Sequence, residues 1–140
     1  MYDAILVPTD GSEAALDAAE HAFSHGERYD ATVHVLAVLE TSESAAIVGR
    51  GNQKLETLHE QGSEATRRIV DEARERDVDV VGAVEFGNPD RAILGYAAAN
   101  DVDLVVMSTH GRSGVSRFLR GSVTEQVIRD GDVPVLAVQR

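Results

Sequence analysis

The sequence of 140 residues contains no cysteine and no tryptophan. Without cysteine, a disulfide framework, a thiol nucleophile and thiolate metal sites are all excluded. The longest apolar runs span only a few residues, far short of the roughly 20 that a membrane helix needs, and the N-terminus lacks a basic segment followed by an apolar one. We therefore expect one cytoplasmic domain over residues 1–140, without a membrane partner, whose structure depends on packing alone.

Positively charged residues are also few. The chain has 24 acidic residues against 13 basic ones, a formal net charge of −11, and only Lys54 is a lysine. Because attraction to a phosphate backbone needs a positive face, this composition argues against a nucleic-acid partner. The acidic excess is typical of a halophilic composition suited to a high-salt cytoplasm, while a GC-rich genome is the alternative explanation for the preference for arginine.

Apolar runs alternate with segments of helical periodicity along the chain. Strands are expected at residues 4–7, 31–40, 77–86, 101–108 and 133–139, and helices at 13–26, 52–76, 89–99 and 122–130. The expected strands are nearly continuous Val, Ile, Leu and Ala, as is typical when helices cover both faces of a parallel sheet. We predict the α/β class: one doubly wound, Rossmann-like open sheet of five parallel strands with four helices, in the order 3-2-1-4-5.

Local signals mark several of the expected boundaries. Pro8 and the polar turn after it should close the first strand, and Gly26 should end the first helix. Asn88 followed by proline predicts a helix cap with proline at the first helical position. Asp10, three residues before Glu13, could cap the first helix.

Two polar loops follow expected strands. The sequence PTDGS comes after the first strand and STHGRSG after the fourth. Ligands of doubly wound sheets bind outside the carboxyl ends of the strands, where the strand order reverses. If the first and fourth strands are neighbours, these loops face each other across one crevice.

The second loop leads into a helix that begins near Gly121 and Ser122. Ser122 and Glu125 match a capping box, which alone would explain the serine. The same helix start offers unpaired N–H groups and partial positive charge, and a glycine before it lets a phosphate approach. Anion binding and simple capping both remain open, because the loop is neither a Walker A motif nor a nucleophile elbow.

Few side chains near these loops suit catalysis or a metal. Asp10 would repel a phosphate unless its carboxylate met a sugar hydroxyl, a base amino group or a metal. His110 is the one histidine in the second loop and is at most a weak general base. His21 and His25 lie one helical turn apart, a spacing more typical of an exposed polar face than of a metal site. We therefore expect no catalytic residue and no protein-built metal site.

Four stretches together resemble the universal stress protein family: ILVPTDGS, VVMSTHGRSG, RGSVTEQVIR and VPVLAV. The resemblance extends over essentially the whole chain. The nucleotide-binding branch of that family carries Gly, two residues, Gly, nine residues, then Gly followed by Ser or Thr. Gly111, Gly121 and Ser122 match the later part of this signature, whereas Ser108 stands where the first glycine is expected.

The resemblance implies that the chain binds ATP, with Mg²⁺. One group of residues would then line the adenine and ribose side, with a methionine behind the sugar: Pro8, Thr9, Asp10, Val38 and Met107. A second group would hold the phosphates through backbone amides, next to Ser108: Gly111, Gly121, Ser122 and Val123.

The resemblance also implies a homodimer, and residues 133–139 would otherwise leave an exposed apolar sheet edge. We expect two copies to pair through this strand in antiparallel fashion. The expected function is an ATP-binding stress or signalling module whose loop 108–120 is ordered by nucleotide and recognised by a protein partner. The alternatives are a family member that dimerises without binding nucleotide, favoured by Ser108, and a slow ATPase.

Overall fold

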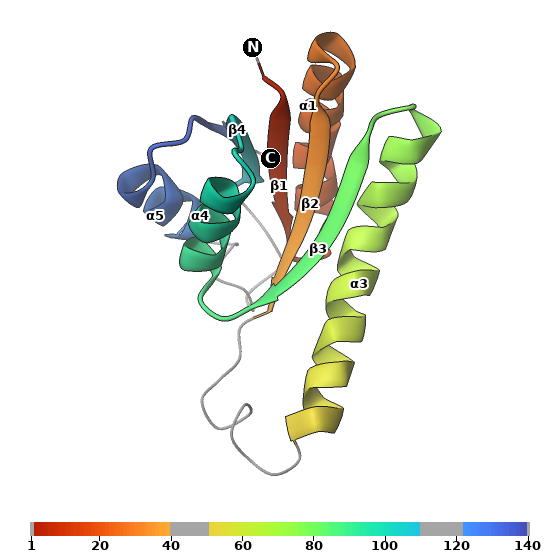
Figure 1. Cartoon of the computed structure of the whole chain (residues 1–140), viewed down its shortest axis with the longest axis vertical. Helices are drawn as coiled ribbons and strands as arrows, with labels where there is room; N and C mark the ends of the chain where they lie inside the picture. The colour runs from red at the N-terminus through yellow and green to blue at the C-terminus, as the bar shows by residue number, and fades with distance from the viewer. Residues whose placement is uncertain (1, 40–50, 110–121, 140) are drawn as a thin grey trace.

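The computed structural model describes residues 2–39, 51–109 and 122–139, without the side chains of residues 51–55, 58 and 122. Within these ranges, five strands alternate with four helices (Figure 1). Their bounds are β1 (Ala4–Thr9), α1 (Glu13–Tyr29), β2 (Thr32–Leu39), α3 (Gly51–Glu75), β3 (Val80–Phe86), α4 (Pro89–Ala99), β4 (Leu104–Ser108), α5 (Ser122–Asp130) and β5 (Val135–Val138). None of the helices in the described residues is both long enough and apolar enough to cross a membrane.

The strands form one parallel sheet in the order β3-β2-β1-β4-β5, which confirms the predicted topology. β1 pairs with β2 over its whole length, from Ala4 opposite Thr32 to Thr9 opposite Ala37. The chain therefore builds the sheet outward from β1, first through β2 and β3 on one side and then through β4 and β5 on the other.

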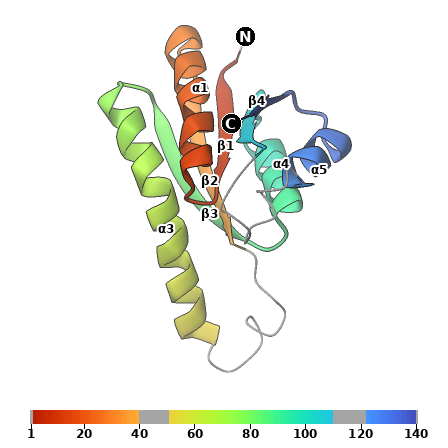
Figure 2. The same cartoon turned by 180° about the vertical axis from the view of Figure 1, so that it is seen from behind.

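Two helical layers cover the sheet. α1 and α3 lie on one face, and α4 and α5 lie on the other (Figures 1 and 2). Each face buries its own hydrophobic cluster: Phe23 and Ile69 pack on the α1–α3 side, and Ile93 and Val127 pack on the α4–α5 side. The alanine-rich face of α1 lets this helix lie close to the central strands.

β1 is longer than predicted, because Pro8 lies within the strand and faces Leu36 of β2. The carbonyl of Asp3 accepts from β2 and that of Ala4 accepts from the segment before β4, so backbone groups alternate between the two neighbours. This alternation directs position 8 towards β4. The recorded pairing with β4 ends at Leu6, as expected because proline has no N–H with which to continue that ladder.

α1 does not end at Gly26 as expected; it continues to Tyr29. Gly26 instead packs closely against the sheet, because a Cβ there would lie only 3.2 Å from methyl groups of both Val33 and Val78. The glycine thus lets α1 approach the sheet, and the tertiary contact outweighs its weak helix propensity.

An aspartate with positive φ ends three of the helices: Asp30 at 55°, Asp77 at 56° and Asp101 at 50°. In each case the next amide donates to a carbonyl five residues earlier, as in a Schellman motif: Ala31 to Gly26, Val78 to Ala73, and Val102 to Ala97. The third and fourth strands consequently start at Val80 and Leu104, later than the predicted positions 77 and 101, because these aspartates complete the helix ends.

Candidate functional site

β1 and β4 lie side by side at the point where the strand order reverses. Their recorded register consists of Ile5 opposite Leu104 and Leu6 opposite Val105. Beyond these pairs, β1 continues to Thr9 and β4 continues to Ser108, and the same offset places those two ends level with each other. The carboxyl ends of the two strands therefore meet at the switch point, which is where doubly wound sheets place a ligand.

The turn after β1 is fixed by short side-chain to backbone hydrogen bonds. The hydroxyl of Thr9, which is 1% exposed, accepts from the amide of Gly11 at 3.0 Å, and Gly11 has a φ of 83°. Asp10 Oδ1 accepts from the amide of Ser12, also at 3.0 Å. Together these contacts fix the turn that carries the half-buried Asp10 at the carboxyl end of β1, and the second one is an Asx-type turn.

Ser12, and not Asp10, caps α1. Its hydroxyl accepts from the amide of Ala15 at 3.2 Å. The capping role considered for Asp10 is thus wrong, because the helix starts two residues later than that role requires. Asp10 supports the cap indirectly, through the amide of Ser12. At α4 the position of the expected cap is confirmed, although Asn88 makes no side-chain capping hydrogen bond.

The first turn of α5 is attached to the end of β4. Thr124 Oγ1 donates to the carbonyl oxygen of Ser108 at 3.1 Å, and these residues are 3% and 7% exposed. Next to them, the amide of Thr109 donates to the carbonyl of Val138 in β5 at 3.0 Å. The helix start and the end of β4 therefore hold each other in place.

Sequence reasoning missed Thr124. The available signal was a hydroxyl residue between Val123 and Val127, on the face of α5 that is apolar and buried. A buried hydroxyl needs a hydrogen-bond partner, so its position predicted a tertiary contact but not which one.

Three of the predicted site residues form one apolar layer beneath the crevice. Val38, Met107 and Val123 belong to the hydrophobic cluster on the α4–α5 side, and Met107 is only 1% exposed. Pro8 follows Leu6 by two positions and so lies on the same face of β1. The side chains of this layer are buried in the hydrophobic cluster, so little of them is exposed to a ligand.

Thr9 and Ser108 lie on the opposite face of the sheet. Ile5 and Val7 precede Thr9 on its face of β1, while Leu104 and Val106 precede Ser108 on β4, and all four belong to the cluster that packs beneath α1. Their small polar side chains thus line the α1 side of the strand ends. On the α5 side of the strand ends, by contrast, the side chains are those of the apolar layer, so the backbone supplies the polar groups there.

Several predicted residues fall outside the described part of the chain. Gly111, Gly121, His110 and most of loop 108–120 are among them, so their proposed contacts stay predictions. α5 begins at Ser122, as predicted, but the side chain of this serine is not described. The capping box with Glu125 is therefore untested.

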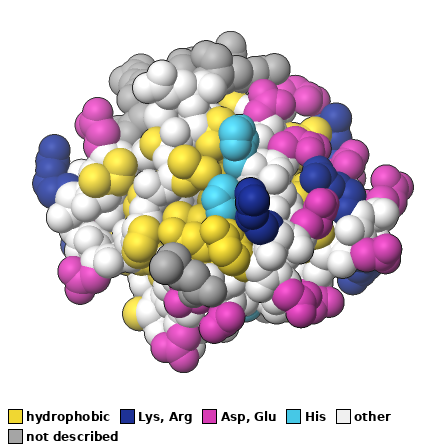
Figure 3. Space-filling model, turned by 90° about the horizontal axis from the view of Figure 1, so that it is seen from above, with side chains coloured by type: hydrophobic (Ala, Val, Ile, Leu, Met, Phe, Trp, Pro, Cys, Tyr) yellow, Lys and Arg dark blue, Asp and Glu magenta, His cyan; other side chains and the backbone are white. Residues whose placement is uncertain are grey.

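No group of three or more metal-binding side chains occurs within residues 2–39, 51–109 and 122–139. His25 donates from Nδ1 to the carbonyl of His21 at 2.8 Å, and its ring stacks on Tyr29 and meets Tyr2, which precedes β1, so it lies at the amino end of the sheet. Figure 3 shows histidine side chains next to hydrophobic ones on the face seen from above. Asp10 supplies one carboxylate at the carboxyl end of β1. Mg²⁺ is commonly held by one or two protein carboxylates, while phosphate oxygens and water complete its shell. A single carboxylate from Asp10 is compatible with this kind of coordination.

The doubly wound parallel sheet, in which the strand order reverses between β1 and β4, defines an α/β protein of the class that binds ligands at this switch point. The model of the universal stress protein family matches residues 1–139. The chain belongs to this family.

Individual relatives agree with this assignment. Universal stress protein MJ0531 of Methanocaldococcus jannaschii is 36% identical, and the match covers 100% of this chain and 84% of the relative. The solved structure of MJ0577, a universal stress protein of the same organism, has a TM-score of 0.87 at 31% identity and covers 100% of this chain and 97% of that one.

Two more distant solved structures share the fold and were determined with nucleotides. A universal stress protein in complex with cAMP has a TM-score of 0.70 at 24% identity, covering 99% of this chain and 97% of that chain. A family member from Arabidopsis thaliana with AMP bound has a TM-score of 0.71 at 16% identity, covering 99% and 92%.

Proposed function

We propose that this universal stress protein binds ATP in the crevice between the carboxyl ends of β1 and β4. The hydrogen bond from Thr124 to Ser108 is the observation that carries the proposal, because it holds the first turn of α5 beside the strand ends. An α5 start in this position directs its unpaired N–H groups and the positive end of its dipole towards the crevice. Phosphate groups are the natural ligand for such a helix start.

The charge of Asp10 orients the ligand. Its carboxylate lies at the end of β1, where it would repel phosphate, whereas ribose hydroxyls or the adenine amino group can donate to it. The phosphates then lie at the α5 end and the nucleoside at the β1–β2 end, above Val38. A ligand with both anionic and hydroxyl groups satisfies both ends, which favours a nucleotide over free phosphate.

Ser108 is compatible with this arrangement. Its side chain lies on the α1 side of β4, opposite the face on which α5 packs, and the residue is 7% exposed. A side chain at this position therefore leaves the α5 side of the crevice open. The relatives determined with cAMP and AMP support an adenine nucleotide as the ligand class.

The proposed role is that of a stress or signalling module. Nucleotide that contacts both the β1 turn and the α5 start would link loop 108–120 to the first strand and so order the loop. The ordered loop would present a surface that differs from that of the empty protein, and a protein partner would recognise it. Magnesium would be held by the phosphates and water with at most Asp10 from the described residues.

The protein would act as a homodimer through residues 133–139. β5 is an edge strand whose carbonyls at Pro134 and Val138 bond to β4 and the residue after it, so positions 135 and 137 direct their backbone groups outward. A second copy that pairs along this edge would cover it.

Titration calorimetry with ATP and Mg²⁺ tests nucleotide binding, with the variant Gly121→Val as the comparison. Loss of binding in a variant that melts like the parent would support phosphate contact at the start of α5. Equal binding by both proteins would place the nucleotide elsewhere, and no heat with the parent at millimolar ATP would favour the family member that binds no nucleotide.

A further inference from the structure

Ile128 is a large hydrophobic residue that the fold leaves in contact with solvent. It is 53% exposed, the highest fraction among the large hydrophobic residues that the structure describes, although it lies well inside α5. Val123 and Val127 of the same helix are fully buried against the sheet. A single exposed apolar residue is ordinary, so the meaning of Ile128 depends on what lies beside it.

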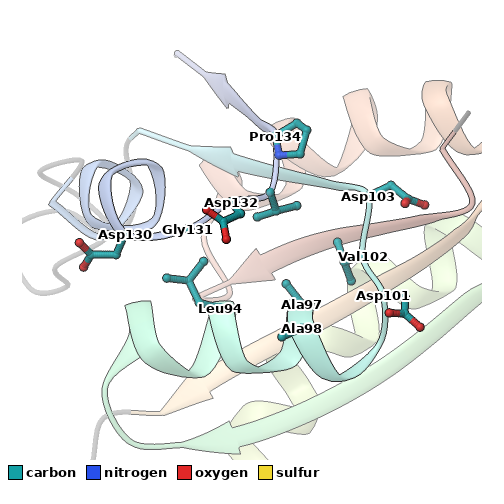
Figure 4. Close-up of a pocket in the computed structure, with 11 residues that line it drawn as sticks. Leu94, Ala97, Ala98, Asp101, Val102, Asp103, Asp130, Gly131, Asp132 and Pro134 are labelled. Atoms are coloured by element: carbon teal, nitrogen blue, oxygen red, sulfur yellow. The ribbon is translucent and has the colours of Figure 1, made fainter.

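Ile128 lies on the side of α5 that faces away from α4. Gln126 and Asp130 line a cavity together with residues of α4, and Figure 4 shows Asp130 of α5 and Leu94 of α4 at one pocket. Successive helical residues are about 100° apart, so Ile128 follows Gln126 by about 200° and lies on the opposite side. Besides α4, α5 contacts β5, the edge strand. Ile128 is therefore directed towards the free edge of the sheet.

Ile128 also lies level with the middle of β5. Ser108 is opposite Val138 in the sheet and is hydrogen-bonded to Thr124, so Thr124 marks the level of Val138. From there α5 runs back along the sheet, antiparallel to β5. Four residues of helix span about 6 Å, and two residues of strand span about 6.6 Å. Ile128 therefore reaches the level of Leu136.

Apolar side chains of β5 continue the surface beside Ile128. Val135 packs with the hydrophobic cluster on the α4–α5 side, and Ala137, two positions further on, lies on the same face of the strand. Val135 is half-buried and Ala137 is exposed. We call Ile128, Val135 and Ala137 the edge surface. The outward backbone groups of β5 belong to two of these three residues.

A second copy of the chain fits this surface by symmetry. When two β5 strands pair antiparallel, both outward positions of each strand are used if Val135 of one copy lies opposite Ala137 of the other. This register places Leu136 on the two-fold axis, level with Ile128. The sheet continues across the axis with the same face towards α5, so the two α5 helices lie on one side of it. Each Ile128 is then directed towards its counterpart.

The charges of α5 agree with contact between two copies. Each chain has a formal net charge of −11, so an interface between copies is disfavoured wherever like charges meet. The edge surface carries no charge. Glu125 and Arg129 are exposed and, by the same helical spacing, lie on the side of α5 that faces away from the sheet.

The other exposed large hydrophobic residues are arranged differently. Val81 and Phe86 lie five positions apart in β3 and therefore on opposite faces of that strand. Tyr29 meets the rings of Tyr2 and His25 within its own chain. Of these residues, Ile128 is the one beside a helix face and a free strand edge that a two-fold axis can complete.

We propose that Ile128 packs against Ile128 of a second copy across the two-fold axis, so that α5 forms part of the dimer interface together with β5. The proposal rests on the β5 pairing proposed above and adds a contact between helices to it. The partner then lies against the helix whose first turn is the proposed phosphate site.

Sedimentation equilibrium of the parent, Ile128→Asp and Val81→Asp tests the helix contact. Val81 is 42% exposed and lies on β3 at the other edge of the sheet, so its variant removes an exposed apolar side chain and adds the same charge away from α5. We expect the dimer dissociation constant to rise at least tenfold in Ile128→Asp and to stay unchanged in Val81→Asp. Equal weakening in both variants would overturn the proposal.

Thiol cross-linking tests the position of the axis. The chain has no cysteine, so Ile128→Cys and Gln126→Cys each carry one thiol, on opposite sides of α5. With a short bismaleimide, we expect Ile128→Cys to form a covalent dimer and Gln126→Cys to stay uncross-linked. Equal cross-linking of the two variants would contradict the contact. If Ile128→Asp does not fold, this comparison decides the question alone.

The variant Ala137→Pro separates this proposal from the β5 pairing on which it rests. A dimer that is lost in Ala137→Pro but kept at parental strength in Ile128→Asp would refute the helix contact and leave the strand pairing standing. A monomeric parent would refute both. None of these measurements needs a nucleotide, so their outcome is independent of ATP binding.

Discussion

The hydroxyl of Thr124 donates a 3.1 Å hydrogen bond to the carbonyl of Ser108, and so joins the first turn of α5 to the end of β4. Both residues are buried, so the contact is shielded from water. It links a helix start, which is suited to phosphate, with the strand that borders the switch point. The geometry of the proposed nucleotide site depends on this one contact.

Thr124→Val keeps the shape of the side chain and removes the donor. The free energy of unfolding should fall by about 1–2 kcal/mol, because the carbonyl of Ser108 loses a buried partner. Affinity for ATP should also fall several-fold, since the start of α5 is no longer held against β4. Calorimetry and denaturant unfolding measure the two effects.

Thr66→Val is the matched control for this variant. Thr66 is also buried, and its hydroxyl donates to the carbonyl of Ser63 within α3, on the other side of the sheet. Its replacement should alter stability but leave ATP affinity unchanged. Equal losses of affinity in both variants would remove the special role of Thr124.

Two helical glycines should respond oppositely to alanine. In Gly62→Ala the new Cβ would lie 2.6 Å from a methyl group of Val84, too close for a stiff β-branched neighbour. The strain should outweigh the gain in helix propensity and lower the free energy of unfolding by about 1–2 kcal/mol. In Gly95→Ala nothing lies within 4 Å of the new Cβ, so stability should rise by up to about 1 kcal/mol.

Urea unfolding of both alanine variants measures the difference. Each variant adds one methyl group to a helix, so the pair separates close packing from intrinsic propensity. A stabilised Gly62→Ala protein would show that α3 is not held as close to β3 as the structure places it.

His34 should make stability depend on pH. Burial lowers the pKa of its imidazole below the ordinary value, and its Nδ1 lies 2.7 Å from the hydroxyl of Tyr96. The unfolded chain therefore binds the proton first as pH falls, so this residue's contribution is complete above about pH 6.5 and declines below it. The parent should lose more stability between pH 7.5 and 5.5 than His34→Gln does, as followed by urea unfolding at each pH. Identical pH profiles would show that His34 is not titrating in this way.

Ala137→Pro should dissociate the proposed dimer without unfolding the chain. The backbone of position 137 faces the free edge of β5, whereas the neighbouring carbonyls at 134 and 138 accept from residues 105 and 109. Proline thus removes an outward donor and leaves the contacts with β4 in place. Light scattering should report a dimer for the parent and a monomer for the variant, with unchanged far-UV circular dichroism. A monomeric parent at micromolar concentration would contradict the dimer itself.

The sequence predicted the fold well because the signal is repeated along the chain. Every strand is an apolar run and every helix has a buried face, so the order of elements follows from periodicity. Boundaries were less predictable where one residue serves a tertiary contact. Gly26 resembles a helix stop but lets α1 approach Val33, and Pro8 resembles a strand stop but lies within β1, where it pairs with β2 beyond the last recorded pair with β4.

The candidate site was predictable in outline only. The positions of Thr9, Asp10 and Ser108 follow from strand order, because parallel strands end at the same edge. The role of Thr124 does not follow, since a buried polar group acquires its partner only when distant elements pack together. The departure of Ser108 from the glycine of the family signature is likewise interpretable only once its face of the sheet is known.

The most direct test of nucleotide binding is titration of the purified protein with ATP in the presence of Mg²⁺, after mass spectrometry has shown which nucleotide co-purifies with it. We predict one binding site per chain for an adenine nucleotide, with an affinity that falls at least tenfold in Gly121→Val while its thermal melting is unchanged. Absence of both a co-purifying nucleotide and any measurable heat at millimolar ATP would contradict the nucleotide site at the β1–β4 switch point.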